Sequence, residues 1–415
     1  MEKTIWAMGI DITKEYMQIS CQERGDMEPV SVSASTDDEK YLIPSLLYFR
    51  EENDTWYIGE QALFNSRSDK RPCFEFDRDI KNNLEYMSIL MGELIDLAKK
   101  TQGFEASQMI CVTLEDYDLN IIRNIFEAFV SLGYDSDRIR VINHDEAFIY
   151  YTINQKKDLW VNDVALFDFD KNHLSYRRMH EIRSNTPSVL SVTREDLSRD
   201  IYYHMLDSAH ERKRADSILS DYIRQEFKRN IVCTVFLTGE GFYDDWYTES
   251  LKEMWGSRRR IFKGYNLFVK GACYAASEKK EGMAEKTHIF RCSGRTKADI
   301  GLLINSQGKN MTITLSPAGT NWYEAGAKVE CILDNVTEIN LVIVSVMDGA
   351  SQNKTIDLSS FPERPNKTTR VRISLAYKNN DVFEVLVEDM GFGELFKSSG
   401  RTVQEIISID DLFSI

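Results

Sequence analysis

The first two thirds of the chain alternate short apolar runs with longer amphipathic stretches. Seven apolar runs predict β-strands at residues 5–10, 17–21, 46–49, 109–112, 139–142, 164–169 and 232–237. Between them, residues 84–98 and 120–132 carry apolar side chains at steps of three and four, the period of an amphipathic helix. Thr193 followed by Asp196 has the composition of a helix start and predicts a further helix there. This alternation predicts an α/β domain with a largely parallel sheet over residues 1–280.

The pattern changes after a polar and charged segment at residues 281–298, which we interpret as a linker. Beyond it, residues 299–415 contain short runs in which apolar and polar side chains alternate, such as Val371, Ile373 and Leu375. A period of two is typical of strands with one buried face, and turn-rich pieces separate the runs. We therefore expect an antiparallel β-sandwich.

The composition of the chain indicates which classes of partner are unsuitable and which cellular compartment to expect. The 415 residues carry a formal net charge of −15, which argues against a nucleic-acid backbone or an anionic membrane as the main partner. Seven cysteines are scattered singly without a Cys-x-x-Cys pair, so we expect reduced thiols and no zinc site. The first residues lack the features of a signal peptide, and no apolar run is long enough to cross a membrane. We expect a globular, cytoplasmic protein of two domains, and the oligomeric state stays open.

The stretch "ALFDFDKNH", residues 165–173, predicts a buried strand that runs into a tight turn. In several ATP-using folds such a turn wraps a phosphate and is built of glycines. Bare backbone amides and positive φ angles, which glycine adopts at least cost, suit that task. Glycines are missing from this turn. It is therefore either a phosphate loop with altered side chains or an ordinary hairpin.

Several stretches, in the same order along the chain, resemble segments of the DnaK-type seventy-kilodalton heat-shock chaperones. In the first domain they are "MGIDITKEYMQIS", "YLIPSLLYF" with "IGEQAL", "ICVTLEDYDLNIIRNIFEAFVSLGYDSDRIRVINHDEAFIYY", "VFLTGEGF" and "FVKGACYAA". In the second domain they are "IDLSSFPERP" and "VLVEDMGFGE". The resemblance implies a reduced actin-like ATPase fold of two lobes, followed by a peptide-binding β-sandwich without the family's helical lid.

The resemblance places nucleotide contacts on the first predicted hairpin. The chain keeps the family's leading carboxylate as Asp11, but it has Thr13, Lys14 and Glu15 where the family has Gly-Thr-Thr. Thr13 and Lys14 are the candidate nucleotide contacts in this hairpin. The carboxylate of Glu15 would repel a triphosphate, and the Lys14 ammonium would offset part of that repulsion.

The second hairpin keeps its carboxylate as Asp168 but has Asp170 and Lys171, followed by Asn172 and His173, where the family has glycines and a threonine. Lys171 is the candidate nucleotide contact of this turn. Asp11 and Asp168 are the candidate catalytic pair, and they would hold the Mg²⁺ of ATP or ADP through water. The alternative is that each carboxylate caps the turn at the end of its strand.

Three further positions of the family's site depart from its pattern or keep it in part. The catalytic lysine falls on Asp77, with Arg78 beside it as a substitute, and a catalytic glutamate falls on His144. Gly239 and Gly241 keep the turn that lets a base or ribose approach, or they serve only a strand-to-helix turn. Because both phosphate loops lack their glycines, ATP or ADP with Mg²⁺ is a possible cofactor and not an expected one.

Three functions remain open on this basis. The first is a chaperone-like interaction protein that binds a protein or peptide partner without efficient ATP hydrolysis. The alternatives are a divergent, active ATP-dependent chaperone and a scaffold built on the actin-like fold. Met311, Trp322 and Tyr323 are the candidate peptide contacts of the sandwich, and each has core packing as its alternative role. We take the first function as the hypothesis, so enzymatic activity is not expected.

Overall fold

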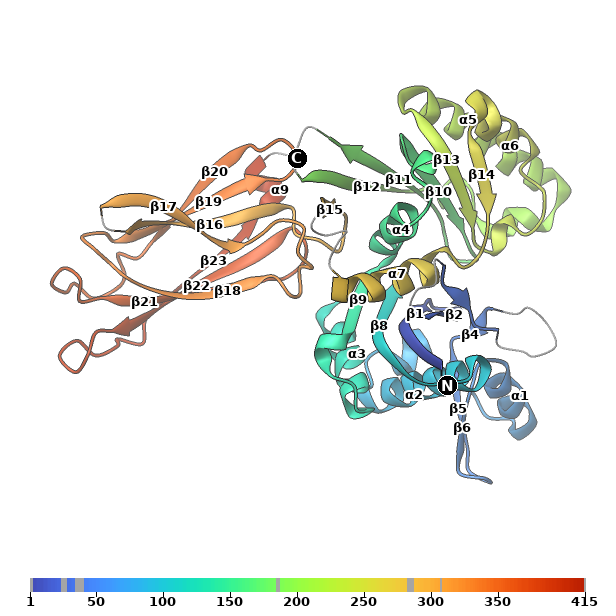
Figure 1. Cartoon of the computed structure of the whole chain (residues 1–415), viewed down its shortest axis with the longest axis horizontal. Coiled ribbons are helices and arrows are strands. Elements are labelled where there is room, and N and C mark those ends of the chain that lie inside the picture. The colour runs from blue at the N-terminus through green and yellow to red at the C-terminus, as the bar shows by residue number, and fades with distance from the viewer. Residues whose placement is uncertain are drawn as a thin grey trace. The chain divides into compact units, whose positions relative to one another are not determined.

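The computed structural model of the chain describes residues 3–23, 28–33, 41–183, 187–281, 287–306 and 308–413. The chain forms two compact units (Figure 1). Unit 1 consists of residues 1–182 and 190–287, and unit 2 consists of residues 183–189 and 288–415. Unit 1 mixes helices with strands, whereas unit 2 is rich in strands.

The first large sheet of unit 1 is built around its first strand. Its strands are β1 (Lys3–Ile12), β2 (Tyr16–Glu23), β3 (Val30–Ser31), β8 (Phe104–Leu114) and β9 (Ile139–Asn143), in the order β3-β2-β1-β8-β9, and β4 (Ile43–Pro44) pairs with β2. β1 runs antiparallel to β2 and parallel to β8, which in turn runs parallel to β9. All five residues of β9 are buried, as expected of a parallel strand that is covered on both faces.

The second large sheet of unit 1 repeats this topology. Its unit 1 strands are β10 (Asp163–Phe169), β11 (Leu174–Ile182), β12 (Ser188–Asp196), β13 (Val232–Thr238) and β14 (Arg260–Lys263), in the order β12-β11-β10-β13-β14. β10 runs antiparallel to β11 and parallel to β13, which runs parallel to β14. Counted along the chain without β4, the unit 1 strands of both sheets have the order third, second, first, fourth, fifth. In each sheet the first strand therefore leads into a hairpin.

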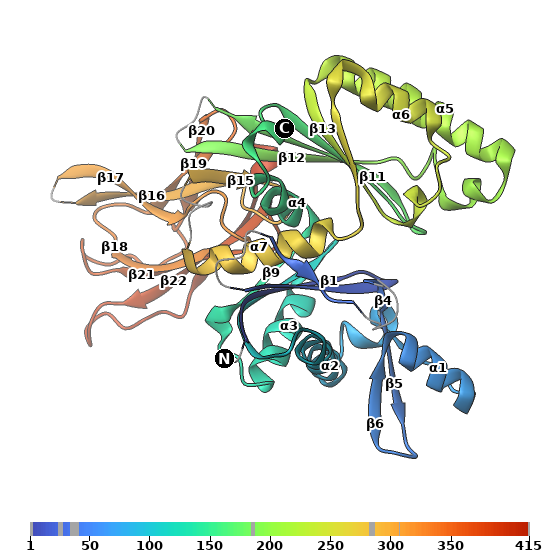
Figure 2. The same cartoon turned by 45° about the vertical axis from the view of Figure 1, so that its right-hand side comes forward.

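Helices cover these sheets. They are α2 (Leu84–Gln102), α3 (Leu119–Ser131), α4 (His144–Ile153), α5 (Ala209–Arg229), α6 (Thr248–Trp255) and α7 (Leu267–Glu281). α2 and α3 pack on one face of the first sheet and α7 on the other, while α5 and α6 lie beside the second sheet (Figures 1 and 2). α4 and α7 approach each other closely, because a Cβ atom on Gly271 would lie 2.0 Å from the backbone oxygen of Ala147.

A smaller sheet lies at the periphery of unit 1. It contains β5 (Leu46–Arg50), β6 (Thr55–Ile58) and β7 (Phe74–Glu75) in the order β6-β5-β7, and it packs against α1 (Gly59–Asp69).

Unit 2 contains two four-stranded antiparallel sheets. Its elements are β15 (His288–Arg291), β16 (Ala298–Ser306), β17 (Lys309–Ser316), β18 (Gly326–Ile332), β19 (Glu338–Ser345), β20 (Ser351–Asp357), β21 (Arg370–Tyr377), β22 (Val382–Gly391), β23 (Thr402–Ser408) and α9 (Ile409–Phe413). The sheet orders are β17-β16-β19-β20 and β18-β21-β22-β23. Along β19, β21 and β22 buried positions alternate with more exposed ones, so each strand turns one apolar face inward.

The structure corrects one predicted element. Thr193 and Asp196 do not begin a helix, because they lie in β12, a neighbour of β11 in the second sheet. The next regular helix begins only at Ala209, after a short 3₁₀ turn at Tyr203–Asp207. Pairing with a neighbouring strand outweighs the local preference of Thr193 for the start of a helix.

The seven strands predicted in the first 280 residues are present, as are the two predicted amphipathic helices. No helix among the described residues combines the length and apolar character needed to cross a membrane.

Candidate functional site

The two hairpins of unit 1 end beside one cavity of about 70 Å³. Its lining comes from β1, β2, the loop after β8, the starts of α4 and α7, the β10–β11 hairpin and the turn after β13. Lining residues from these segments include Asp11, Glu115, His144, Asp168, His173 and Gly239. The volume of this cavity is much smaller than the roughly 300–1,000 Å³ of pockets that bury a drug-sized ligand.

The first carboxylate of the cavity has a histidine partner. Asp11 lies near the end of β1 and is buried, and its Oδ1 is 2.8 Å from Nε2 of His144. His144 is the first residue of α4, and the Asn143 side chain caps that helix by accepting from the backbone N–H of Glu146. The imidazole ring of His144 stacks on Phe268 at a centroid distance of 3.9 Å. Helix capping and ring stacking thus hold His144 against Asp11.

The second carboxylate is paired with two cationic side chains. Oδ2 of Asp168 is 3.3 Å from Nη1 of Arg177 and 3.6 Å from Nε2 of His173. Arg177 is fully buried, and its Nε donates to Oδ1 of Asp145 at 3.0 Å. Burial on its own raises the pKa of Asp168, but His173 and Arg177 outweigh it and lower that pKa to about 2. Asp168 is therefore a carboxylate whose charge is already neutralised inside the protein.

The β10–β11 turn is closed by its own side chain. Oδ1 of Asp170 accepts from the backbone N–H groups of Asn172 at 2.7 Å and His173 at 2.9 Å. In a phosphate loop, amides of this kind face the anion. Here a carboxylate of the same chain occupies them.

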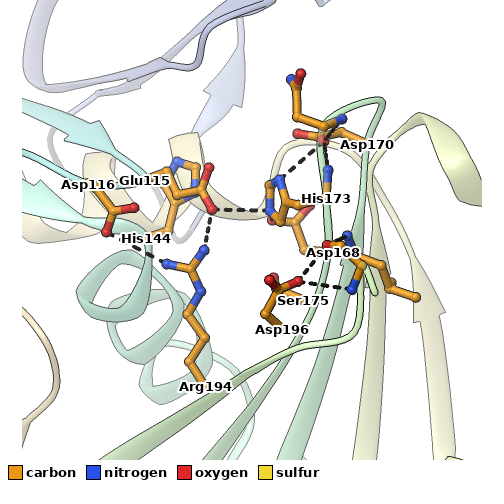
Figure 3. A network of polar contacts seen from close by, with 12 residues as sticks. Glu115, Asp116, His144, Asp168, Asp170, His173, Ser175, Arg194 and Asp196 are labelled. Atoms are coloured by element: carbon orange, nitrogen blue, oxygen red, sulfur yellow. Dashed lines mark hydrogen bonds and ion pairs between the residues drawn. The ribbon is translucent and has the colours of Figure 1, made fainter. Parts of the chain in front are cut away.

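His173 lies at the centre of the charged network in Figure 3. Its Nδ1 is 3.1 Å from Oδ1 of Asp170, and its Nε2 is 3.2 Å from Oε1 of Glu115. Burial lowers the pKa of His173, but the Asp168 and Asp170 carboxylates outweigh it and raise the pKa to about 10. His173 is therefore an imidazolium at neutral pH, and it faces three carboxylates.

Two further contacts extend the network at its rim. Arg194 on β12 donates to Oε1 of Glu115, and its Nη1 is 3.7 Å from Oδ1 of Asp116 (Figure 3). Lys171 is 3.1 Å from Oε2 of Glu240, in the turn after β13. The first contact joins the loop after β8 to the second sheet, so it connects the two halves of unit 1.

These residues do not fit a magnesium nucleotide. The Asp11 carboxylate already contacts His144, and the Asp168 carboxylate already contacts His173 and Arg177. The amides of the second turn are taken up by Asp170, whose carboxylate would also repel a phosphate. Among the described residues, no group of three or more His, Cys, Asp or Glu side chains is arranged to hold a metal ion.

Two of the predicted nucleotide contacts, Thr13 and Lys171, contact other residues of the protein. The Thr13 hydroxyl donates to the backbone oxygen of Tyr16 at 2.9 Å and accepts from its N–H at 3.0 Å. Lys14 is exposed and is not part of the cavity lining. Lys171 binds Glu240 at the rim.

The two predicted turn glycines are required by packing against Phe169. A Cβ atom on Gly239, which has a φ of 92°, would lie 2.2 Å from the Phe169 backbone oxygen. A Cβ atom on Gly241 would lie 2.3 Å from the Phe169 ring. Gly239 also lines the cavity, whereas Gly241 does not.

The structure places Arg78 outside the cavity lining. It is exposed, and its guanidinium pairs with Asp79 and Glu75. The neighbouring Asp77 is also exposed and pairs with Lys81. Neither Arg78 nor Asp77 lines the cavity.

The sequence did not identify three residues of this network, namely Arg177, Glu115 and Arg194. Leu174 and Tyr176 lie on one face of β11, and Ser175 and Arg177 lie on the other. Both faces are buried, so the position of Arg177 in this strand was the available sign of a buried charge. A buried arginine requires a buried carboxylate partner nearby. Glu115 and Arg194 are ordinary charged residues in the sequence, and only the fold brings them together.

The candidate peptide contacts of unit 2 differ in exposure. Met311 on β17 is 48 % exposed. Trp322 is buried and packs edge-on against Tyr323 at a centroid distance of 6.1 Å. Trp322 is therefore a core residue that offers little surface to a peptide.

Family comparisons cover nearly the whole chain. Residues 28–293 match the family of unknown function (DUF5716) C-terminal, and residues 295–409 match the domain of unknown function DUF8552. Comparison with curated proteins gave no match. Because the first match covers more than half of the chain, the chain belongs to the DUF5716 C-terminal family, a family of unknown function.

Proposed function

We propose that unit 1 has a reduced actin-like fold, similar to that of the DnaK-type chaperones, in which internal ion pairs have replaced the nucleotide. The repeated five-strand topology supports this proposal, as does the presence of a carboxylate near the end of the first strand in each repeat, Asp11 and Asp168. One observation carries the functional part. The Asp170 carboxylate occupies the amides of the second hairpin, and the His173 imidazolium pairs with the carboxylates around it.

A magnesium nucleotide would have to break this network before it could bind. Removing one partner from a buried ion pair costs roughly 3–5 kcal/mol, because the other charge is left buried and unpaired. Arg177 with Asp168 is such a pair, and the contact between His144 and Asp11 would be lost as well. The binding energy of the nucleotide would first have to offset the loss of these contacts. The protein therefore works as a pseudo-ATPase, without efficient hydrolysis.

The chain then acts as a chaperone-like interaction protein of the cytoplasm, with a protein or peptide as its partner. Unit 2 offers β17 and β20 as edge strands of one sheet, and β18 and β23 as edge strands of the other. An edge strand has unpaired backbone groups to which an extended segment can add. A scaffold function uses the same units without gripping an unfolded peptide.

Calorimetric titration of the purified protein with ATP-Mg and with ADP, followed by a hydrolysis assay, tests the proposal. We expect neither binding heat nor turnover. Micromolar binding together with turnover that is lost in Asp11→Asn would instead establish the active ATPase. Fluorescence anisotropy with labelled unfolded peptides then separates the two remaining functions, because only the chaperone-like protein binds them saturably.

A further inference from the structure

Three of the four edge strands of unit 2 carry charged side chains that oppose pairing with an identical strand. Lys354 on β20 and Glu405 on β23 point inward, and they pair with each other at 3.4 Å. Their cross-strand neighbours are Leu341 and Val385, and both of these are fully buried. β18 carries charged side chains as well, among them Glu330. Inward-pointing charges and like charges placed opposite each other both disfavour the joining of two edges.

β17 is the edge strand whose charge is confined to its first residue. That residue is Lys309, and residues 310–316 carry no charge. The threonines and the isoleucine among them favour an extended strand. β17 is also the end strand in the order β17-β16-β19-β20. One side of its backbone can therefore form hydrogen bonds with a further strand.

Two apolar side chains of β17 are exposed although they lie on the inner face of the sheet. Ile313 is the cross-strand neighbour of Leu302 on β16, and Met311 lies two residues before Ile313 on the same face. Leu302 is 2 % exposed, whereas Met311 is 48 % and Ile313 38 % exposed. The apolar face of the sheet thus reaches solvent at its β17 edge. A further strand beside β17 would remove both side chains from water, which favours the addition of a strand.

The sequence of β17 is complementary to itself in one antiparallel register. With Thr312 on a two-fold axis perpendicular to the sheet, Thr312 lies opposite Thr312 of the second copy, and Met311 lies opposite Ile313 of the second copy. Each side chain then stays on its own face, so the apolar pairs form on the inner face and the threonine pair on the outer face. Such pairs stabilise antiparallel strands, and no charge is placed opposite a like charge. A register with Ile313 on the axis would set Met311 against Leu315, which is only 5 % exposed, so less apolar surface would leave water.

We propose that two copies of this chain associate through antiparallel pairing of their β17 strands, which joins two four-stranded sheets into one continuous sheet. The partner is a second copy because β17 itself supplies the matching sequence, with an apolar side chain for each exposed apolar side chain. The contact carries no charge, whereas each chain has a formal net charge of −15. Added salt should therefore screen the repulsion between the copies and tighten the dimer. The inference goes beyond the proposed function and depends only on the fold of unit 2.

Sedimentation-velocity ultracentrifugation of the full chain over a concentration series tests the proposal. We expect a reversible species with twice the mass of the chain, whose share rises with protein concentration and with salt. Thr312→Lys places two ammonium groups opposite each other and should weaken the dimer by about fivefold. Ile313→Lys removes the apolar pairs that both copies of Ile313 form and should weaken the dimer by about tenfold. Asn353→Lys changes the net charge by the same amount at an exposed site on β20, the opposite edge of the same sheet, and should leave the dimer unchanged.

A cysteine on the two-fold axis tests the register. The Cα atoms of directly opposed residues in antiparallel strands lie about 4.5–5.5 Å apart, within the range that a disulfide spans. Mild oxidation of Thr312→Cys should therefore give a covalent dimer on non-reducing gel electrophoresis. Asn353→Cys and the wild type, with its seven native cysteines, are the controls and should stay monomeric on the same gel.

The proposal is wrong if the wild type stays monomeric throughout the concentration series, or if Asn353→Lys weakens the association as much as Thr312→Lys does. It is also wrong if a labelled extended peptide binds to the monomer and loses that binding in Ile313→Lys, because a segment of another protein would then occupy this edge. Circular dichroism checks that each variant is folded, and the covalent dimer of Thr312→Cys is a gain of signal that its matched control lacks. Binding and hydrolysis of ATP-Mg would overturn the proposed function and leave this inference intact.

Discussion

Replacement of His173 by glutamine removes the cation at the centre of the network and keeps a polar side chain of similar length. Cationic partners lower the pKa of the buried Asp168 from 3.8 to about 2 against the opposing effect of burial, and at about 1.36 kcal/mol per pKa unit this corresponds to a net stabilisation of roughly 2 kcal/mol. Arg177 supplies part of this amount and remains in the variant. His173 also faces Asp170 and Glu115, so we expect the free energy of unfolding of unit 1 to fall by about 2 kcal/mol.

The effect of His173→Gln on the free energy of unfolding should depend on pH. Because the folded-state pKa of His173 is raised from 6.5 to about 10, its contribution is fully present below pH 6.5 and is lost as the pH rises through 10. Because the pKa of Asp168 is lowered, its contribution is present above pH 3.8 and is lost as the pH falls toward 2. The difference between wild type and His173→Gln should therefore be largest between about pH 4 and pH 6.5, and it should shrink as the pH rises from 6.5 to 10.

Thermal unfolding followed by tryptophan fluorescence measures this difference. Five of the six tryptophans belong to unit 1, so their emission reports on its unfolding. We expect Tm to fall by about 4 °C at pH 6, at about 2 °C per kcal/mol, the lower end of the range for domains of 150–250 residues, because unit 1 is larger than these domains. His210→Gln is the control, because His210 is 89 % exposed and contacts Glu211 at 3.2 Å. An unchanged Tm of His173→Gln at pH 6, or a loss that is equally large at pH 10.5, would refute the reasoning.

Two further substitutions test the packing and the charge pairing of the separate units. Gly271→Ala should lower the Tm of unit 1, because the added Cβ would lie 2.0 Å from the backbone oxygen of Ala147 and overpacking costs roughly 1–3 kcal/mol; a wild-type Tm would contradict the close approach of α4 and α7. Arg364→Leu should destabilise unit 2 by roughly 3–5 kcal/mol, because it leaves the buried Asp389 carboxylate without the two 2.7 Å bonds from the guanidinium. Urea unfolding followed by far-ultraviolet circular dichroism measures this loss, and a midpoint equal to that of the wild type would show that the pair contributes little.

The sequence by itself determined the local elements and the places where chemistry is concentrated. Apolar runs of strand length marked β1, β10 and β13, because a strand buried on both faces needs a continuous apolar side-chain set. Polar residues directly after β1 and β10 marked the hairpins, and the missing glycines after Asp168 marked a turn that is unsuited to a phosphate. These are local properties of the chain, which depend on neighbouring residues and on backbone geometry.

Only the tertiary structure decided which charges meet. His144 and Asp11 are 133 residues apart, and Glu115 reaches Arg194 only because the two halves of unit 1 face each other at the hairpins. Sequence periodicity tells which face of a strand Arg177 occupies, but a charge pair depends on the position of both partners in space. The folding of two sheets around one cavity made a network of ion pairs from residues that the sequence shows as separate charges.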